Sequence, residues 1–362
     1  MGFDGTAQAL GLAGANLFAA SSRARSGCVL KAADGTVLAT GTTGGAGALS
    51  AELEALRNVV EQGGSTSGAT AYLVVEPDNS AACDALIAAG IARAVVSVAH
   101  PGPDWAGQGI ARLRAAGIVV EVGPGASQAR ELNLGLFSRL QRQRPWVRLK
   151  AAISLDGATA LPDGRSQWIT AAAARTDGHA WRARACAVLT GMGTVRDDNP
   201  RLDVRLVPTP RQPPLVIVDS RLETPLNAAL FEVPERAVWI YAAHADPSRQ
   251  AALEQRGATV TLLPQPNGKV ALPALMQDLA RRGINELHVE AGAQLNGSLV
   301  REGLVDEFLV YMAPKLIGEG RPLAAFGPLA DLGEALALRF QSVEQVGDDL
   351  RILARVVGRD DF

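Results

Sequence analysis

The sequence predicts an α/β protein of two domains, each a sheet covered by helices. The chain has 362 residues, which is enough for two cores of ordinary size. Short apolar runs alternate with amphipathic segments along its length, the pattern of strands that alternate with helices. A basic, polar run at 139–144, followed by Pro145, interrupts this alternation. We therefore expect domains at residues 1–144 and 145–362.

The first domain is predicted to be a small layered α/β unit. A hairpin is expected over 27–40, turning at Asp34-Gly35. Helices are expected at 7–20, 51–62, 81–89, 106–116 and 126–140, and strands at 71–76, 94–98 and 118–122. The apolar segment 7–20 follows Asp4 and no basic residue, so it is interpreted as a packed amphipathic helix in preference to a signal peptide.

The second domain repeats the alternation on a larger scale. Strands are predicted at 147–154, 186–190, 215–219, 237–242, 259–263, 286–290 and 307–313. Helices are predicted between them at 171–184, 247–256, 272–282 and 293–302. The last two apolar runs, 339–346 and 350–357, are close enough to form an antiparallel pair.

Composition excludes several classes of partner. A net charge of −2 does not indicate the basic surface that binds nucleic acid or an anionic membrane. No stretch approaches the roughly twenty apolar residues that span a bilayer. Three cysteines, few and far apart, argue against a disulfide framework and fit a reducing cytoplasm. The expected partner is a small molecule.

The first domain carries an incomplete zinc-deaminase motif. Such enzymes hold zinc with the His of H-x-E and two later cysteines, while the Glu moves protons. The matching segments here are Ser50-Ala51-Glu52 and Pro77-Asp78…Cys83, so Glu52 and Cys83 remain while a serine and an aspartate replace two ligands. A serine hydroxyl is a poor zinc ligand. We predict that this domain binds no metal and is inactive, and no metal site is predicted elsewhere.

The second domain places polar and glycine residues directly after its strands. Ala291 to Ser298 follow a strand and open a helix, a turn that can bind a pyrophosphate through free N–H groups. Thr190 to Thr194 follow another strand in the same way. Ser220-Arg221, at a third strand end, could hold a 2′-phosphate, although Arg221 could equally be a solvated turn cation.

Both domains resemble the riboflavin-biosynthesis deaminase/reductase family. In the first domain the resemblance rests on Gly27-Cys28-Val29, Val75-Glu76-Pro77 and the run from Cys83 to Gly90, and in the second it extends through the whole half. It implies a cytidine-deaminase-like three-layer domain followed by a dihydrofolate-reductase-like domain. It also implies NADPH-dependent reduction of 5-amino-6-(5-phosphoribosylamino)uracil to the ribitylamino product, and a homodimer or higher homo-oligomer.

The same resemblance implies the residues of the site. The positions matching cofactor contacts are Ala152, Trp168, Thr194, Asp198, Ser220, Gly292, Ala293, Gln294, Leu295, Asn296, Gly297 and Ser298. The positions matching substrate contacts are Ser166, Arg182, Leu202, Arg205 and Glu290. Paired arginines suit a substrate phosphate, and a carboxylate can accept the N–H groups of an aminouracil ring. Trp168 could instead be a core residue.

Lys150 is the candidate catalytic cation, with Asp198 expected to orient it. A structural ion pair between Lys150 and Asp156 is the alternative. Two other functions stay open: a reductase of a related ribosylated or pterin-like substrate, and a scaffold without catalytic activity. Loss of the substrate residues would favour the first, and failure to bind NADPH would favour the second.

Overall fold

A computed structural model of the protein describes residues 3–18, 22–45 and 47–362. The chain divides into two compact units, one up to Gln143 together with Phe362 and one from Arg144 to Asp361. The division falls within a residue of the expected boundary. In the part of the chain that is described, every helix is too short or too polar to cross a membrane.

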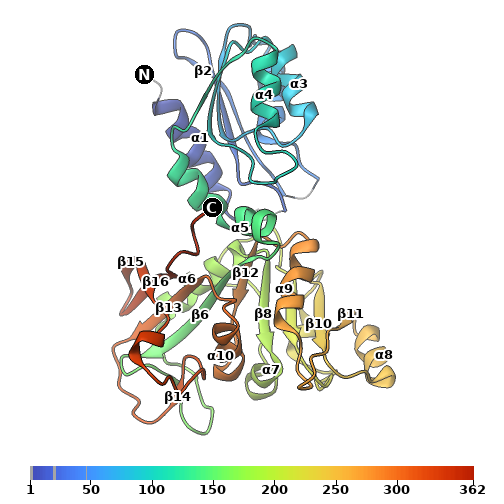
Figure 1. The fold of residues 1–362 in the computed structure, drawn as a ribbon, viewed down its shortest axis with the longest axis vertical. Helices are drawn as coiled ribbons and strands as arrows, with labels where there is room; N and C mark the ends of the chain where they lie inside the picture. Colours follow the sequence, from blue (N-terminus) through green and yellow to red (C-terminus); the bar gives the residue numbers. More distant parts are fainter. Residues whose placement is uncertain (1–2, 19–21, 46) are drawn as a thin grey trace. The chain divides into compact units, whose positions relative to one another are not determined.

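The first unit is built on a five-stranded sheet in the order β2-β1-β3-β4-β5 (Figure 1). Its strands are β1 (Gly27–Lys31), β2 (Val37–Thr42), β3 (Thr70–Val75), β4 (Arg93–Val98) and β5 (Val119–Val122). The hairpin β1-β2 is antiparallel, and β3, β4 and β5 are parallel. The predicted hairpin and strands are therefore confirmed.

Helices cover both faces of this sheet, which makes the unit three-layered. They are α1 (Phe3–Ala15), α2 (Ala51–Glu61), α3 (Ser80–Ala88), α4 (Gln108–Ala115) and α5 (Ala126–Arg142). Leu73 faces the core formed with α2, α3 and α4, whereas its neighbour Val74 faces the core formed with α1 and α5. Helix α1 ends at Ala15, earlier than predicted; positions 19 and 20 of the predicted helix lie outside the described residues.

The second unit is built on a nine-stranded sheet in the order β11-β10-β9-β8-β12-β6-β13-β16-β15. The strands are β6 (Trp146–Ser154), β8 (Ala187–Gly191), β9 (Leu215–Val218), β10 (Val238–Ala242), β11 (Ala258–Leu262), β12 (Glu286–Val289), β13 (Glu307–Ala313), β15 (Leu338–Val346) and β16 (Asp349–Val356). Neighbours from β11 to β13 are parallel, and β16 and β15 continue the sheet antiparallel. The predicted closing pair is confirmed.

Five helices connect these strands. They are α6 (Ala172–Arg184), α7 (Met192–Asp198), α8 (Pro247–Gln255), α9 (Leu272–Arg281) and α10 (Ala293–Arg301). Helix α7 was predicted only as a glycine-containing turn, because its glycines lower helix propensity. The short strands β7 (Ala158–Ala160) and β14 (Arg321–Pro322), which pair with each other, were not predicted. The 3₁₀ turns η1 (Ala229–Glu232) and η2 (Leu332–Glu334) complete the unit.

A buried ion network fastens β6 between its neighbours. The Arg148 guanidinium lies 3.0 Å from the Glu286 carboxylate on β12 and 2.6 Å from the Glu307 carboxylate on β13. All three side chains are buried, so each charge depends on its partners. Because Lys150 follows Arg148 by two residues and Glu290 directly follows β12, this network fixes the separation of the two site residues.

Candidate active site

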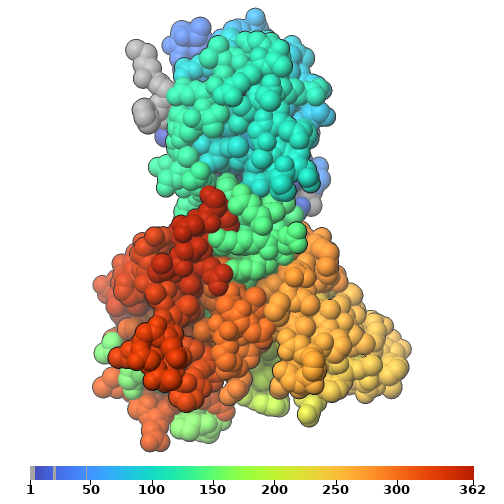
Figure 2. Space-filling view, in the orientation of Figure 1, coloured from blue at the N-terminus to red at the C-terminus, as the bar shows by residue number. Residues whose placement is uncertain are grey.

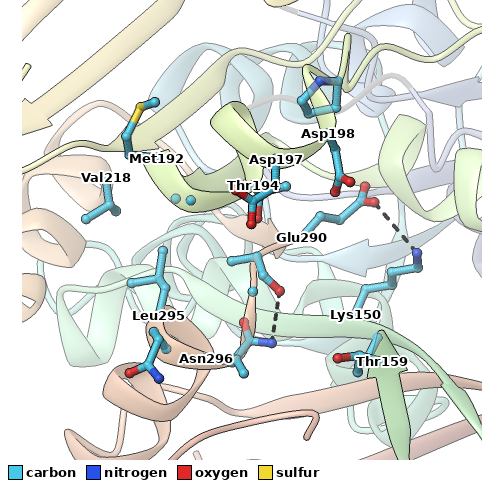
Figure 3. A pocket seen from close by; sticks show the side chains of 18 of the residues that line it. Lys150, Thr159, Met192, Thr194, Asp197, Asp198, Val218, Glu290, Leu295 and Asn296 are labelled. Atoms are coloured by element: carbon cyan, nitrogen blue, oxygen red, sulfur yellow. Dashed lines mark hydrogen bonds and ion pairs between the residues drawn. The ribbon is translucent and has the colours of Figure 1, made fainter. Parts of the chain in front are cut away.

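The second unit contains a cavity of about 1780 Å³ along the carboxyl ends of its parallel strands. Residues at or beyond the ends of β6, β12, β8, β9, β10 and β11 line it, and these six strands are neighbours. At a strand spacing of 4.7–4.9 Å, the lined edge is about 24 Å long. The shape is an elongated groove at the edge where open α/β sheets bind ligands. Figure 3 shows this groove from close by.

The predicted glycine turn follows β12 and lines the groove between the ends of β8 and β6. Gly292 is the N-cap of the nine-residue helix α10 and provides no capping side chain. The first N–H groups of α10 are therefore free to bind an anion, at the positive end of the helix dipole. A Cβ on Gly191 would lie 3.0 Å from Leu295 Cδ2, so the turns after β8 and β12 approach closely. These groups fit a dinucleotide pyrophosphate.

The structure places nearly all the predicted cofactor residues on the wall of the groove. Gly297 is the exception, because a Cβ there would lie 2.1 Å from the Ala325 carbonyl oxygen. Gly297 therefore packs α10 against the segment around residue 325. The buried Asn296 amide donates to the Ala291 and Leu323 carbonyls at 3.1 and 2.8 Å, and so holds the turn in place.

Lys150 faces Glu290 in the groove. Its Nζ lies 3.8 Å from Glu290 Oε2. A dashed line marks this ion pair in Figure 3. The alternative pairing with Asp156 is wrong, because that carboxylate accepts from the Ser154 hydroxyl and, at 2.7 Å, from the Gly318 N–H. These hydrogen bonds lower the pKa of Asp156 to about 2.

Glu290 is also bound by Arg182 through two parallel contacts. Arg182 Nε donates to Oε1 at 2.7 Å, and Nη2 donates to Oε2 at 3.0 Å. Burial alone would raise the pKa of Glu290, but Arg182 and Lys150 together hold it well below its usual range. The carboxylate is therefore ionised. His288 Nε2 also lies 3.4 Å from Oε1, whereas Lys150 is 3.8 Å from Oε2, so the acceptor capacity left for a ligand is mainly on Oε2.

The substrate residues form two groups with different surroundings. Arg182, predicted as a phosphate ligand, is engaged with Glu290 and with the Asp203 carbonyl, so it is not a free cation. Arg205 and Arg201 both pair with the Asp203 carboxylate, Arg201 at 3.4 Å, and are more exposed. Because their side chains are about half exposed and share one carboxylate, Arg201 and Arg205 are the better candidates for binding a substrate phosphate. Ser166 and Leu202 line the groove beside them.

Trp168 is exposed within the groove, so its interpretation as a core residue is wrong. Its side chain is 62% accessible, and the Arg175 guanidinium stacks over the ring at 4.6 Å. Asp198 ends helix α7, and burial followed by the Asp197 charge raises its pKa. Among the described residues no hydrogen bond or ion pair joins it to Lys150, so the predicted orienting contact is absent there.

Several residues that line the groove were missed in the sequence. They are Arg175, Arg201, His244, Lys269, Tyr311 and Arg321. Arg201 has a local signal, because it lies beside Arg205 in the run 196–205 that carries three arginines. Arg175 lies on helix α6, and the rest come from loops and strands far along the chain; their local sequence contains no indication of a site.

In the first unit, the residues at the zinc-ligand positions of a deaminase do not fit zinc binding. Ser50 is the N-cap of α2, and its hydroxyl accepts from the Leu53 N–H at 3.5 Å. Cys83 is fully buried in the apolar core, and burial raises the pKa of its thiol to about 11. Asp78 lies 3.6 Å from the Arg23 guanidinium. Within the described ranges, no group of three His, Cys, Asp or Glu side chains could hold a metal.

These features define the class of protein: a cytidine-deaminase-like three-layer domain joined to a dihydrofolate-reductase-like domain with a nucleotide-sized groove. The family model described as the RibD C-terminal domain matches residues 145–352. The chain belongs to the RibD family of riboflavin biosynthesis proteins.

Relatives of known name agree over the full length of the chain. It is 38% identical to the riboflavin biosynthesis protein RibD of Escherichia coli, over 95% of this chain and 96% of that one. It is 37% identical to RibD of Aquifex aeolicus, over 88% of each. The solved structure of Acinetobacter baumannii RibD matches with a TM-score of 0.87, at 34% identity and 98% coverage of both chains.

A second solved structure matches as closely in shape. It is a diaminohydroxyphosphoribosylaminopyrimidine deaminase/5-amino-6-(5-phosphoribosylamino)uracil reductase from Thermotoga maritima. The TM-score is 0.85, at 25% identity and 98% coverage of both chains. The fold class and the family predicted from the sequence are thereby confirmed.

Proposed function

We propose that the protein is an NADPH-dependent reductase of 5-amino-6-(5-phosphoribosylamino)uracil, which it converts to the ribitylamino product. The observation that carries this proposal is one groove whose wall contains both the uncapped N-terminus of α10 and the Lys150–Glu290–Arg182 cluster. The helix N-terminus suits a dinucleotide pyrophosphate. The charged cluster suits a polar heterocycle with an attached sugar.

The end of β9 favours NADPH over NADH. An enzyme that prefers NADH usually presents a carboxylate to the ribose 2′-hydroxyl. Here the carboxylate at the strand end, Asp219, is buried and accepts from the Glu223 and Thr224 N–H groups and from the Thr224 hydroxyl at 2.6–2.9 Å. Ser220 and Arg221 line the groove instead, and both can donate to a phosphate.

The chemistry assigned to the residues is positioning and charge stabilisation. Glu290 accepts the ring N–H groups, and Arg201 and Arg205 bind the substrate phosphate. When bound, NADPH supplies a hydride to the sugar C1. Lys150 stabilises the sugar oxygen as the ring opens to the imine, and the reduction takes up one proton in addition to the hydride.

We also propose that the deaminase half is inactive. The support is that the residue at each of these zinc positions has another interaction. Ser50 caps α2, Asp78 pairs with Arg23, and Cys83 packs in the apolar core. Burial raises the pKa of Glu52, which lacks a metal-bound water to deprotonate. A separate deaminase must then supply the substrate. Three free, buried cysteines suit a reducing cytoplasm.

The test is to offer the purified protein the pyrimidine before and after deamination, in separate cuvettes with NADPH. We expect NADPH oxidation only with the deaminated compound, no released ammonia and less than stoichiometric zinc in elemental analysis. Ammonia release together with bound zinc would contradict the inactive deaminase half. No oxidation with either compound would contradict the proposed reductase.

We propose in addition that the reductase half forms a homodimer through the edge strand β15. This strand closes the sheet at one end and exposes the apolar side chains Leu338, Phe340 and Val343, with Phe340 69% accessible. An exposed apolar edge strand favours pairing with another strand. A second copy of β15, related by a twofold axis, would cover both edges at once.

The Phe340→Glu variant is therefore expected to elute as a monomer of 37.7 kDa, where the unaltered protein has twice that mass. Two buried glutamates facing each other at a twofold interface would repel and lose solvation. Light scattering after gel filtration measures the mass. Val60→Glu, on an exposed position of α2, is the matched control. An unaltered mass for Phe340→Glu would move the interface elsewhere.

A further inference from the structure

The end of the groove beyond β9 is lined by residues that the proposed reaction has not used. They come from the ends of β10 and β11 and include His244, Gln265, Asn267 and Lys269. The pyrophosphate turn and the end of β9 lie on one side of this region, so a dinucleotide that spans the groove must place its adenosine half here.

A small hairpin presents Lys269 to the groove. Its ends are joined by a bridge between Pro264 and Val270, and the Gln265 N–H donates to the Lys269 carbonyl at 2.8 Å. Gly268 makes the turn with a positive φ of 72°. A Cβ on Gly268 would lie 3.1 Å from His244 Nε2, so the turn rests on that imidazole. The position of Lys269 is therefore set by the fold.

Two exposed cations, Lys269 and Arg221, lie at this end of the groove. Among the described residues, neither Lys269 nor Arg221 forms an ion pair, and both are exposed to the groove. The nearest strand-end carboxylate, Asp219, is buried in its own loop, which leaves Glu223 as the acidic side chain on this wall. Two unpaired cations with an adjacent imidazole suit a phosphomonoester.

We propose that Lys269, together with Arg221 and His244, binds the 2′-phosphate of the adenosine half and makes Lys269 a specificity-determining residue for the cofactor. This inference rests on the proposed dinucleotide-dependent function. Lys269 contributes a point charge from the hairpin after β11, on the same sheet edge as Ser220-Arg221 and separated from them by the end of β10. The 2′-phosphate would thus be held from two loops that are about fifty residues apart in the chain.

The experiment is a calorimetric titration with adenosine 2′,5′-bisphosphate and with adenosine 5′-monophosphate, neither of which needs turnover. We expect the unaltered protein to prefer the bisphosphate. Lys269→Met is expected to weaken bisphosphate binding about tenfold, since a hydrogen bond to a charged group is worth a factor of that size. Binding of the monophosphate should change by less than about twofold. Lys269→Glu should weaken bisphosphate binding further.

Arg256→Met is the matched control, because it removes an exposed cation near β11 that does not line the groove. It should leave both affinities unchanged. If Lys269→Met keeps the full preference of the unaltered protein, the role of Lys269 is overturned while the proposed reductase stands. If the unaltered protein binds the two nucleotides equally, the NADPH preference itself fails, and the role of Lys269 fails with it.

Discussion

Lys150→Met is expected to lower turnover by about two to three orders of magnitude while leaving the affinity for NADPH unchanged. Lys150 lines the groove on β6 two residues before Ala152, and its charge lies 3.8 Å from Glu290 Oε2. Opening of the sugar ring places developing negative charge on an oxygen. Without the Lys150 cation, that charge loses a fixed partner beside the reacting sugar.

The measurement separates chemistry from binding. Single-turnover oxidation of NADPH gives the rate of the chemical step, and fluorescence titration gives the cofactor affinity. Lys150→Arg keeps the charge and should recover part of the rate. Arg57→Met, an exposed cation on α2, serves as the control. If Lys150→Met turned over at the rate of the unaltered protein, Lys150 would be a structural partner of Glu290 and nothing more.

The order of helices and strands was predictable because it depends on local periodicity. The apolar runs that became β9 and β10 are continuous, as buried parallel strands require, and the amphipathic run that became α9 has one apolar face. The glycine turn at Gly292 was recognised for the same reason: a short strand, a turn and a helix follow one another without a break.

The pairing of charges was not predictable, because it depends on which strands become neighbours. Arg182 and Glu290 are 108 residues apart, and nothing in either local sequence indicates their bidentate contact. Asp156 lies close to Lys150 in the chain, yet its own turn uses the carboxylate. The proposed contribution of Lys269 has the same origin, since the parallel order β9-β10-β11 brings its hairpin to the same sheet edge as Arg221.

Glu290→Gln is expected to lower the free energy of unfolding at neutral pH by about 3 kcal/mol. The carboxylate receives Arg182 in two contacts and Lys150 in a third, and both Glu290 and Arg182 are largely shielded from water. The neutral amide of glutamine can accept only some of these hydrogen bonds. It also leaves the shielded Arg182 guanidinium without its counter-charge. Urea unfolding at several pH values measures the loss, with Glu254→Gln as an exposed control.

The difference in unfolding free energy between Glu290→Gln and the unaltered protein should depend on pH, and this dependence identifies its electrostatic origin. Because the folded-state pKa of Glu290 lies well below its usual value, its contribution is fully present above the ordinary glutamate pKa of about 4.3. The stabilising contribution of Glu290 disappears as the pH falls through its folded-state pKa. The stability curves of Glu290→Gln and the unaltered protein should therefore converge in acid. A difference that stayed constant down to acid pH would indicate lost packing rather than lost charge.

The same variant should also lose about a hundredfold in kcat/KM with the deaminated pyrimidine. In the unaltered protein the cluster of Arg182, Lys150 and Glu290 has one net positive charge, and the substitution raises it to two. The amide would also present a donor to ring N–H groups that need acceptors. A variant that folds, binds NADPH and yet discriminates poorly between related rings would place substrate selection in Glu290. Wild-type kcat/KM would instead leave Glu290 with only the structural task of holding Arg182.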